Sequence, residues 1–239
     1  MENYFEKPIT IEPSYCDADG KLAIWQAFNL FMDVATEHAA LFGSGWKDLS
    51  GRGLFWLTVK TKVVIEDRPK MDDPVVIVTW AGAPNRLRTD RSYELRQGDR
   101  TLIRALTEWA VLDTRTGKLI MIDEVFPEGL EFNRASAVPE GFTRVKDHFE
   151  GIEPYAEYAI RSTDIDIGGH MNNVAYVRAL LGTFSNTELR EWQPKSFDVI
   201  FRSQSFEGDV LQFYQQPAGD GRDIRVARGD ETVLLVHME

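Results

Sequence analysis

The pattern of hydrophobic and polar positions predicts one long helix and several strands in the first half of the chain. Apolar residues recur at helical spacing from 22 to 42, and the wide apolar stripe is typical of a helix enclosed by a sheet. After it come four strand-like segments separated by turn residues: 53–65, 75–81, 87–97 and 101–113. A buried helix followed by successive antiparallel strands predicts an α+β unit whose sheet curls around the helix.

The second half repeats this plan. A strand is predicted at 8–15 before the first helix and another at 158–162 before a nearly continuous apolar helix from Val174. The segment 17–20 aligns with 164–167 at an offset of 147 residues, and the turn at Asp73 aligns with that at Asp209 at an offset of 136. We therefore expect two units, residues 1–140 and 150–239. The Pro-, Gly- and charge-rich segment 126–150 is predicted to link them.

Polar residues are most concentrated between 164 and 176, which reads D-I-D-I-G-G-H-M-N-N-V-A-Y. They precede a helix, whose first turn has unpaired N–H groups and a partial positive charge that suit a developing oxyanion. A carboxylate at this place is able to activate water. Taken singly, Asp, Gly and Asn here are at least as readily explained as a turn and a helix cap. The whole cluster together favours a catalytic site.

Composition narrows the possible functions. The chain has 239 residues, of which 43% are hydrophobic, and a single cysteine, so no internal disulfide forms. The first residues lack the basic and apolar regions of a signal peptide, and no apolar run reaches membrane-spanning length, so we expect a cytoplasmic protein without membrane contact. A net charge of −11 argues against nucleic-acid binding. No metal-ligand spacing or phosphate-binding glycine loop is present, and we expect no metal and no cofactor.

The motif D-x-D-x-x-G-H-x-N-N-x-x-Y resembles the active-site signature of hot-dog-fold thioesterases. The flanking sequence resembles, more narrowly, the acyl-acyl carrier protein thioesterases of bacteria and plant plastids, and further similar segments lie at 29–39, 54–60 and 105–118. The resemblance implies a tandem double hot dog, in which two antiparallel sheets each wrap around a long helix. It also implies hydrolysis of fatty acyl thioesters of acyl carrier protein to free fatty acids in fatty acid biosynthesis.

The resemblance also assigns roles to residues. Asp166, the second aspartate of the motif, is the expected catalytic group, acting either as a general base on water or by attacking the carbonyl itself. His170 is expected to assist it through a hydrogen bond, and Asn172 and Asn173 either orient water or hold the loop. The expected acyl pocket, whose aromatic and methionine side chains are equally explained as ordinary core, is lined by Trp25, Phe28, Phe31 and Met32.

Three positions depart from the family pattern. Gly168 stands where the family usually has asparagine, and Gln204 and Ser205 stand where it usually has glutamate and, in the plant enzymes, cysteine. A glutamine is not a general base, and a serine without an adjacent base is a poor nucleophile. A cysteine-type mechanism is therefore not expected, and we expect Gln204 and Ser205 to position substrate or water.

An acyl carrier protein is the partner that the resemblance implies. Such carriers are acidic, so docking on this acidic chain requires a local basic patch. The predicted patch residues are Arg86, Arg88 and Arg91, with Arg52, Arg178 and Lys47 as further candidates. Two alternatives stay open: an acyl-CoA thioesterase, and a non-catalytic protein that binds acyl ligands. We expect the chain to be a monomer or a homodimer.

Overall fold

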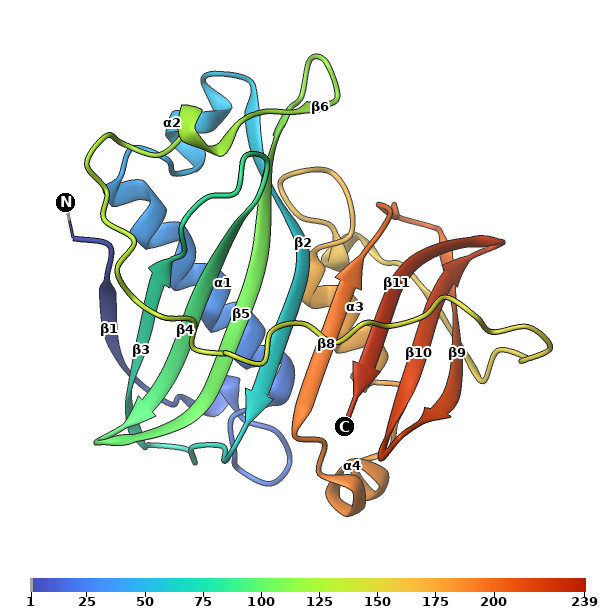
Figure 1. Cartoon of the computed structure of the whole chain (residues 1–239). Coiled ribbons are helices and arrows are strands. Elements are labelled where there is room, and N and C mark those ends of the chain that lie inside the picture. Colours follow the sequence, from blue (N-terminus) through green and yellow to red (C-terminus); the bar gives the residue numbers. More distant parts are fainter. Residues whose placement is uncertain (1) are drawn as a thin grey trace. The chain divides into compact units, whose positions relative to one another are not determined.

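The computed structural model describes residues 2–239, and its internal contacts divide the chain into two compact units, Met1–Gly141 and Phe142–Glu239. We call them unit 1 and unit 2. Each is an α+β structure in which every paired strand is antiparallel to its neighbours (Figure 1).

Unit 1 contains a sheet of strand order β1-β3-β4-β5-β2, with β6 paired to β5. Its elements are β1 (Phe5–Thr10), η1 (Pro13–Tyr15), α1 (Ile24–Leu41), α2 (Trp46–Ser50), β2 (Leu54–Ile65), β3 (Pro74–Ala81), β4 (Thr89–Gln97), β5 (Arg100–Asp113), β6 (Lys118–Leu119) and η2 (Ile122–Glu124).

The predicted helix and four following strands of unit 1 are confirmed. Helix α1 packs against β1 and β3, and Figure 1 shows it running behind β3, β4 and β5. The predicted first strand, 8–15, is wrong in its second half. The strand ends at Thr10, and Pro13, whose fixed φ and missing N–H suit the first position of a helical turn, begins the 3-10 helix η1.

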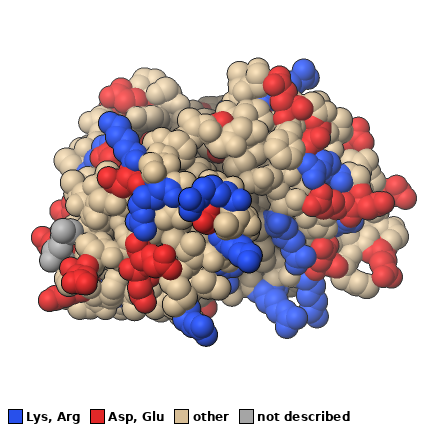
Figure 2. Space-filling model, turned by 90° about the horizontal axis from the view of Figure 1, so that it is seen from above, with Lys and Arg blue, Asp and Glu red and all other residues tan. Residues whose placement is uncertain are grey.

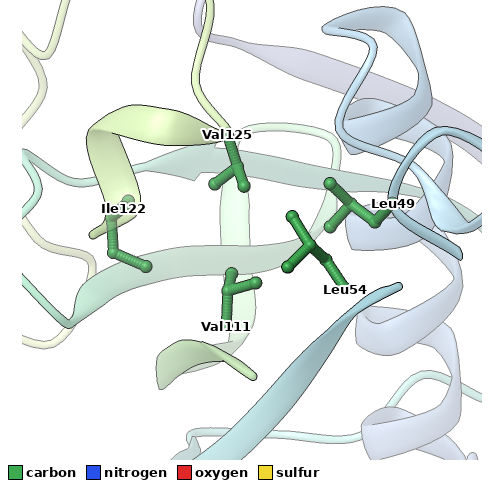
Figure 3. Close-up of a cluster of buried hydrophobic side chains, with 5 residues drawn as sticks. All are labelled: Leu49, Leu54, Val111, Ile122 and Val125. Carbon is green, nitrogen blue, oxygen red and sulfur yellow. The ribbon is translucent and has the colours of Figure 1, made fainter. Parts of the chain in front are cut away.

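One end of unit 1 is closed by a small hydrophobic cluster (Figure 3). Leu49 of α2, Leu54 of β2 and Val111 of β5 pack there with Ile122 and Val125, which lie in and directly after η2. Burying these aliphatic side chains fixes the short helix and the segment that leaves the sheet, because each contributes about 1.5–3 kcal/mol of transfer free energy.

Unit 2 contains a sheet of strand order β8-β11-β10-β9-β7. Its elements are β7 (Ala156–Ala159), η3 (Ser162–Asp164), α3 (Asn173–Leu181), α4 (Asn186–Trp192), β8 (Ser196–Phe201), β9 (Val210–Ala218), β10 (Gly221–Arg228) and β11 (Glu231–Met238). Seven of the nine residues of α3 are buried, as its apolar sequence predicts, and Tyr176 contacts Phe201 of β8. The strand predicted at 158–162 is shorter and earlier, and η3 follows it.

The turn before the main helix is built in the same way in both units. Asp17 N donates to Lys21 O at 2.8 Å, and Asp166 N donates to His170 O at 3.0 Å. These bonds make Asp17 the counterpart of Asp166, an offset of 149 residues. The alignment of Asp17 with Asp164 was therefore wrong by two positions.

The second predicted correspondence is confirmed. Lys70 N donates to Asp73 Oδ2 at 2.8 Å in unit 1, and Phe206 N donates to Asp209 Oδ2 at 2.9 Å in unit 2. The two turns thus keep the predicted offset of 136. Over residues 2–239, no helix combines the length and the apolar character needed to cross a bilayer.

Candidate active site

The motif folds into a tight loop between η3 and α3. Ile165 and Met171 form an isolated antiparallel bridge, and inside it Gly169 N donates to Asp166 O at 3.0 Å. Gly169 has φ of 78°, a conformation that glycine adopts without the cost other residues incur. Met171 N donates to Ser205 O at 2.8 Å, which ties the loop to the segment after β8.

Asp166 has one carboxylate oxygen held and the other open. Gly168 N donates to Oδ1 at 2.7 Å, and the side chain keeps 24% of its surface exposed. Within residues 2–239, Oδ2 makes no hydrogen bond, and the nearest basic group is His170, whose Nδ1 lies 3.9 Å from Oδ1. The carboxylate is therefore oriented by the backbone while one oxygen stays available to water.

Gly168 lets the imidazole and the carboxylate converge. A Cβ at position 168 would lie 2.8 Å from His170 Nε2, which is closer than such atoms approach, and 3.0 Å from Asp166 Oδ1, which is a tight contact. The His170 ring occupies space beside the 168 backbone, so the glycine found in place of the family's asparagine has a local steric reason.

Asp164, in contrast, is buried and its carboxylate is held by several hydrogen-bond donors. It is 2% exposed, and its carboxylate accepts hydrogen bonds from Tyr158 OH at 2.8 Å, Arg161 N at 2.8 Å and Arg178 Nη2 at 2.6 Å. Burial raises the pKa of the Asp164 carboxyl, but these three donors outweigh burial and hold it below its usual value. Asp164 O also accepts from Asn172 N at 2.8 Å. The residue therefore fastens both ends of the loop.

The two asparagines occupy different positions at the start of α3. Asn172 is the N-cap, and its Oδ1 accepts from Val174 N at 2.8 Å. Asn173 is the first helical residue and is partly buried. The predicted loop-holding role fits Asn172 through this capping bond.

Unit 1 contains a neutralised version of the same loop. Leu22 N donates to Pro69 O as Met171 N donates to Ser205 O, so Arg68, one residue before Pro69, is the counterpart of Gln204. Arg68 Nη1 forms an ion pair with Asp17 Oδ2 and also donates to Leu22 O at 3.0 Å.

The comparison of the two loops bears on Gln204 and on the number of active sites. In unit 1 the side chain at the position equivalent to Gln204 reaches the loop carboxylate. An arginine compensates Asp17, whereas Asp166 has only a neutral amide at the matching position. A compensated carboxylate is a poor base, so this geometry favours one reactive carboxylate, Asp166.

Gln204 and Ser205 differ in accessibility. Gln204 is exposed, and its carbonyl accepts from Arg228 Nη1 at 3.0 Å. Ser205 is fully buried, and its Oγ makes no hydrogen bond of normal geometry within residues 2–239. The carbonyl of Ser205 accepts the hydrogen bond from Met171 N, so the backbone of Ser205, rather than its side chain, positions the loop.

The expected acyl-pocket residues all lie on α1. Phe28 and Phe31 are buried, at 3% and 1% exposure, while Trp25 and Met32 are partly exposed. Phe31 packs on Tyr93 of β4, with 5.1 Å between ring centroids.

The prediction that Arg91 belongs to a surface docking patch is wrong. Arg91 is only 6% exposed and lies inside unit 1, so it is not a surface docking residue. Its position in β4, flanked on both sides by paired strands, turns it inward although Arg86 and Arg88 in the preceding loop stay accessible. Among residues 2–239, no group of three or more His, Cys, Asp or Glu side chains is arranged to hold a metal ion.

Comparison with known families identifies the chain. Residues 2–129 match the N-terminal domain of acyl-ACP thioesterases, and residues 151–233 match the C-terminal domain. The chain belongs to the acyl-ACP thioesterase family.

Members of the acyl-ACP thioesterase family with curated names are distant relatives. A palmitoyl-acyl carrier protein thioesterase of Arabidopsis thaliana chloroplasts is 23% identical over 221 residues, covering 87% of this chain and 54% of its own length. A chloroplastic dodecanoyl-[acyl-carrier-protein] hydrolase of Cinnamomum camphora is 25% identical over 221 residues, covering 87% and 58%. The chain thus spans little more than half the length of these relatives.

Two solved structures share the fold of the whole chain. An acyl-ACP thioesterase from Bacteroides thetaiotaomicron matches with a TM-score of 0.81 at 22% identity, covering 99% of this chain and 97% of its own. The 12:0-ACP thioesterase of Umbellularia californica matches with a TM-score of 0.82 at 21% identity, covering 99% and 96%.

Proposed function

We propose that this chain hydrolyses fatty acyl thioesters of acyl carrier protein and releases free fatty acids for fatty acid biosynthesis. The observation that carries the proposal is the pair of matching loops. In unit 1 the loop aspartate is bound by Arg68, while in unit 2 Asp166 has an open oxygen and the position equivalent to Arg68 is a neutral glutamine, Gln204. Membership of the acyl-ACP thioesterase family supports the same reaction.

The proposed reaction uses the open oxygen of Asp166. As a general base, Oδ2 takes a proton from water, the hydroxyl oxygen adds to the thioester carbonyl, and the C–S bond breaks as the tetrahedral intermediate collapses. Alternatively, Oδ2 attacks the carbonyl directly, the C–S bond breaks and the thiolate leaves, and water then hydrolyses the acyl-enzyme anhydride to the free fatty acid and the Asp166 carboxylate. In both routes Gly168 N–H holds Oδ1 and fixes the direction of the open oxygen.

The other members of the proposed site act on position and charge. His170 lies beside the carboxylate, and Asn172, Asn173, Gln204 and the backbone of Ser205 hold the loop or orient water. We assign the acyl pocket to the α1 side chains Trp25, Phe28, Phe31 and Met32. We also propose that each unit is a hot dog, which makes the chain a tandem double hot dog that acts as a monomer or homodimer.

Docking of the acidic carrier is assigned to basic side chains at one end of unit 1. Arg52 Nη2 donates to Glu124 O at 3.0 Å and Arg86 O accepts from Ile122 N at 2.8 Å, so both border η2. Lys47 is exposed on the adjoining α2. Figure 2 shows Lys and Arg side chains in groups on one face of the protein, with acidic side chains between them. The acidic surroundings make local charge, rather than net charge, decisive for docking.

The test compares one acyl group on three donors: acyl carrier protein, coenzyme A and a small uncharged thiol. We expect the highest kcat/KM on the carrier protein. The double variant Arg52→Glu/Arg86→Glu is expected to lower kcat/KM about tenfold on the carrier and to leave the small thioester unchanged, because rim charges act mainly on association. Preference for coenzyme A would favour the acyl-CoA thioesterase alternative.

A non-catalytic acyl-binding protein is the remaining alternative, and Gly168, Gln204 and Ser205 are the departures that suggest it. Binding of acyl ligands without release of thiol from any donor would establish it. The plant relatives are chloroplastic. Our assignment of this chain to the cytoplasm is tested by cell fractionation.

A further inference from the structure

The interior of unit 1 contains an arginine that no carboxylate neutralises. Arg91 Nη1 donates to His38 Nδ1 at 2.9 Å and to Thr79 Oγ1 at 3.3 Å. Within residues 2–239, Arg91 forms no ion pair, and both of its hydrogen bonds come from Nη1. Burial lowers the pKa of the guanidinium, yet an arginine keeps its charge in proteins. A buried charge without a partner is strongly unfavourable.

His38 on α1 does not supply the missing negative charge. Arginine only donates, so His38 Nδ1 accepts and the imidazole is neutral with its proton on Nε2. Burial and the Arg91 charge lower the pKa of His38 to about 3, against a smaller opposing effect of the Glu2 backbone. The side chain is 1% exposed, and Nε2 makes no hydrogen bond of normal geometry within residues 2–239.

Further polar groups lie on the same face of the sheet. Arg91 pairs in register with Thr107, and Tyr93 and Trp109 lie two residues along β4 and β5, so all four side chains point to one side. The contact between Phe31 and Tyr93 shows that this side faces α1. Tyr93 OH and Trp109 Nε1 are buried and, in the described part of the chain, lack hydrogen bonds of normal geometry.

The pKa of Tyr93 agrees with this environment. Burial raises the pKa of Tyr93 to about 12, although Arg91, Trp109 and Thr107 act in the opposite direction. The hydroxyl therefore stays protonated and does not balance the charge of Arg91. Among residues 2–239, the cluster therefore holds a cation and no anion that balances it.

We propose that Arg91, with His38, Tyr93 and Trp109, forms a carboxylate-binding site inside unit 1. A carboxylate accepts two parallel hydrogen bonds from the Nε and Nη2 side of a guanidinium, which supplies both the charge and the acceptors that the cluster lacks. Phe31, one of the proposed acyl-pocket residues, packs directly on Tyr93, so the site adjoins the proposed acyl lining.

Two kinds of ligand would bring a carboxylate to the proposed Arg91 site. One is the far end of a dicarboxylic acyl chain, which makes the site a determinant of substrate choice. The other is the carboxylate of a free fatty acid, which makes it a site for product binding. The first source rests on the proposed function, whereas carboxylate binding itself does not.

The binding experiment is calorimetry of the full chain with octanoate, octanedioate and uncharged 1-octanol. We expect wild type to bind the carboxylates and Arg91→Met to bind them at least tenfold more weakly, with 1-octanol unaffected. Arg96→Met is the matched control, because Arg96 lies on the same strand and pairs with Glu94. Equal carboxylate affinity in wild type and Arg91→Met, or no binding to wild type, contradicts the proposal.

The source is decided by kcat/KM for octanedioyl and octanoyl thioesters of one carrier. A ratio that falls at least tenfold in Arg91→Met supports the dicarboxylic substrate. An unchanged ratio, with inhibition by octanoate lost, supports the free fatty acid. If no variant hydrolyses either thioester, the proposed function fails while calorimetry still decides the carboxylate site. If the thioesters are hydrolysed but octanoate binds equally well to wild type and Arg91→Met, the carboxylate site is refuted while the proposed function stands.

Folding is checked by circular dichroism and the unfolding midpoint. Because Arg91 is uncompensated without ligand, Arg91→Met is expected to be at least as stable as wild type. Should that variant not fold, Tyr93→Phe and Trp109→Phe each remove one donor and are expected to weaken octanoate binding about fivefold. Unchanged affinity in both variants would refute the site.

Discussion

At the scale of single residues, the surroundings of Asp164 and Asp166 distinguish a structural carboxylate from the proposed catalytic one. Asp164 has three donors on its carboxylate and almost no exposure, while Asp166 has one backbone donor and an open oxygen. The sequence identifies both residues but not this division, because the donors Tyr158 and Arg178 are brought to Asp164 by folding.

Replacing Asp164 by asparagine is expected to destabilise the protein by about 1.5–3 kcal/mol at pH 7, because a charged acceptor with several donors is lost. The pKa of Asp164 is lowered in the folded state, so its contribution is present above the unfolded value of about 3.9 and is lost as pH falls through the folded value. Urea unfolding should therefore show a gap between wild type and Asp164→Asn that is full well above pH 4 and narrows as the pH falls below about 4. The exposed Asp220→Asn serves as control; a gap independent of pH would refute this account.

Gly168 offers a second test at this scale. A methyl group there meets His170 Nε2 and Asp166 Oδ1, so Gly168→Ala is expected to displace the imidazole and lower kcat about tenfold or more with little change in KM. Gly51→Ala, at the C-cap of α2 with φ of −61°, adds a methyl group whose nearest neighbours are Lys47 O at 3.5 Å and Asp48 O at 3.8 Å, and it controls for general effects of losing a glycine. Wild-type kcat in Gly168→Ala would show that the ring position is immaterial.

At the scale of elements, helix α3 positions the loop through its cap. Asn172 accepts the Val174 N–H, so Asn172→Ala is expected to cost about 1 kcal/mol of unfolding free energy. Asn173→Ala, one position into the helix, is expected to leave the unfolding free energy unchanged or to raise it by a few tenths of a kcal/mol, because alanine has the higher helix propensity. Thermal or urea unfolding of both variants checks the prediction, and equal losses would mean that Asn172 does not act as the cap.

The elements also show where sequence patterns mislead. Periodicity located α1 and strands β2 to β5 because one face of each is buried. The string D-x-D occurs in both halves and suggests pairing Asp17 with Asp164. The backbone hydrogen bonds of the turn instead pair Asp17 with Asp166, two residues further along. The matching D-x-D strings therefore pair the wrong aspartates. Only the backbone hydrogen bonds show that Arg68 and Gln204 occupy equivalent positions.

At the scale of the whole molecule, two similar units differ in what they do with the same loop. Unit 1 neutralises its aspartate and holds a buried cluster around Arg91, while unit 2 leaves one oxygen of Asp166 open. The sequence pointed to the proposed catalytic segment through one dense motif. It did not predict the Arg91 cluster, because His38, Thr79 and Arg91 are far apart along the chain and only strand pairing and helix packing unite them.

The most direct measurement is single-turnover hydrolysis of an acyl carrier protein thioester by wild type, Asp166→Asn and Asp17→Asn, with folding verified for each. We expect Asp166→Asn to lose about 10²–10⁴-fold in rate, as for removal of a general base, and Asp17→Asn to stay within a few-fold of wild type. Equal rates for Asp166→Asn and wild type would contradict the assignment of the reaction to Asp166.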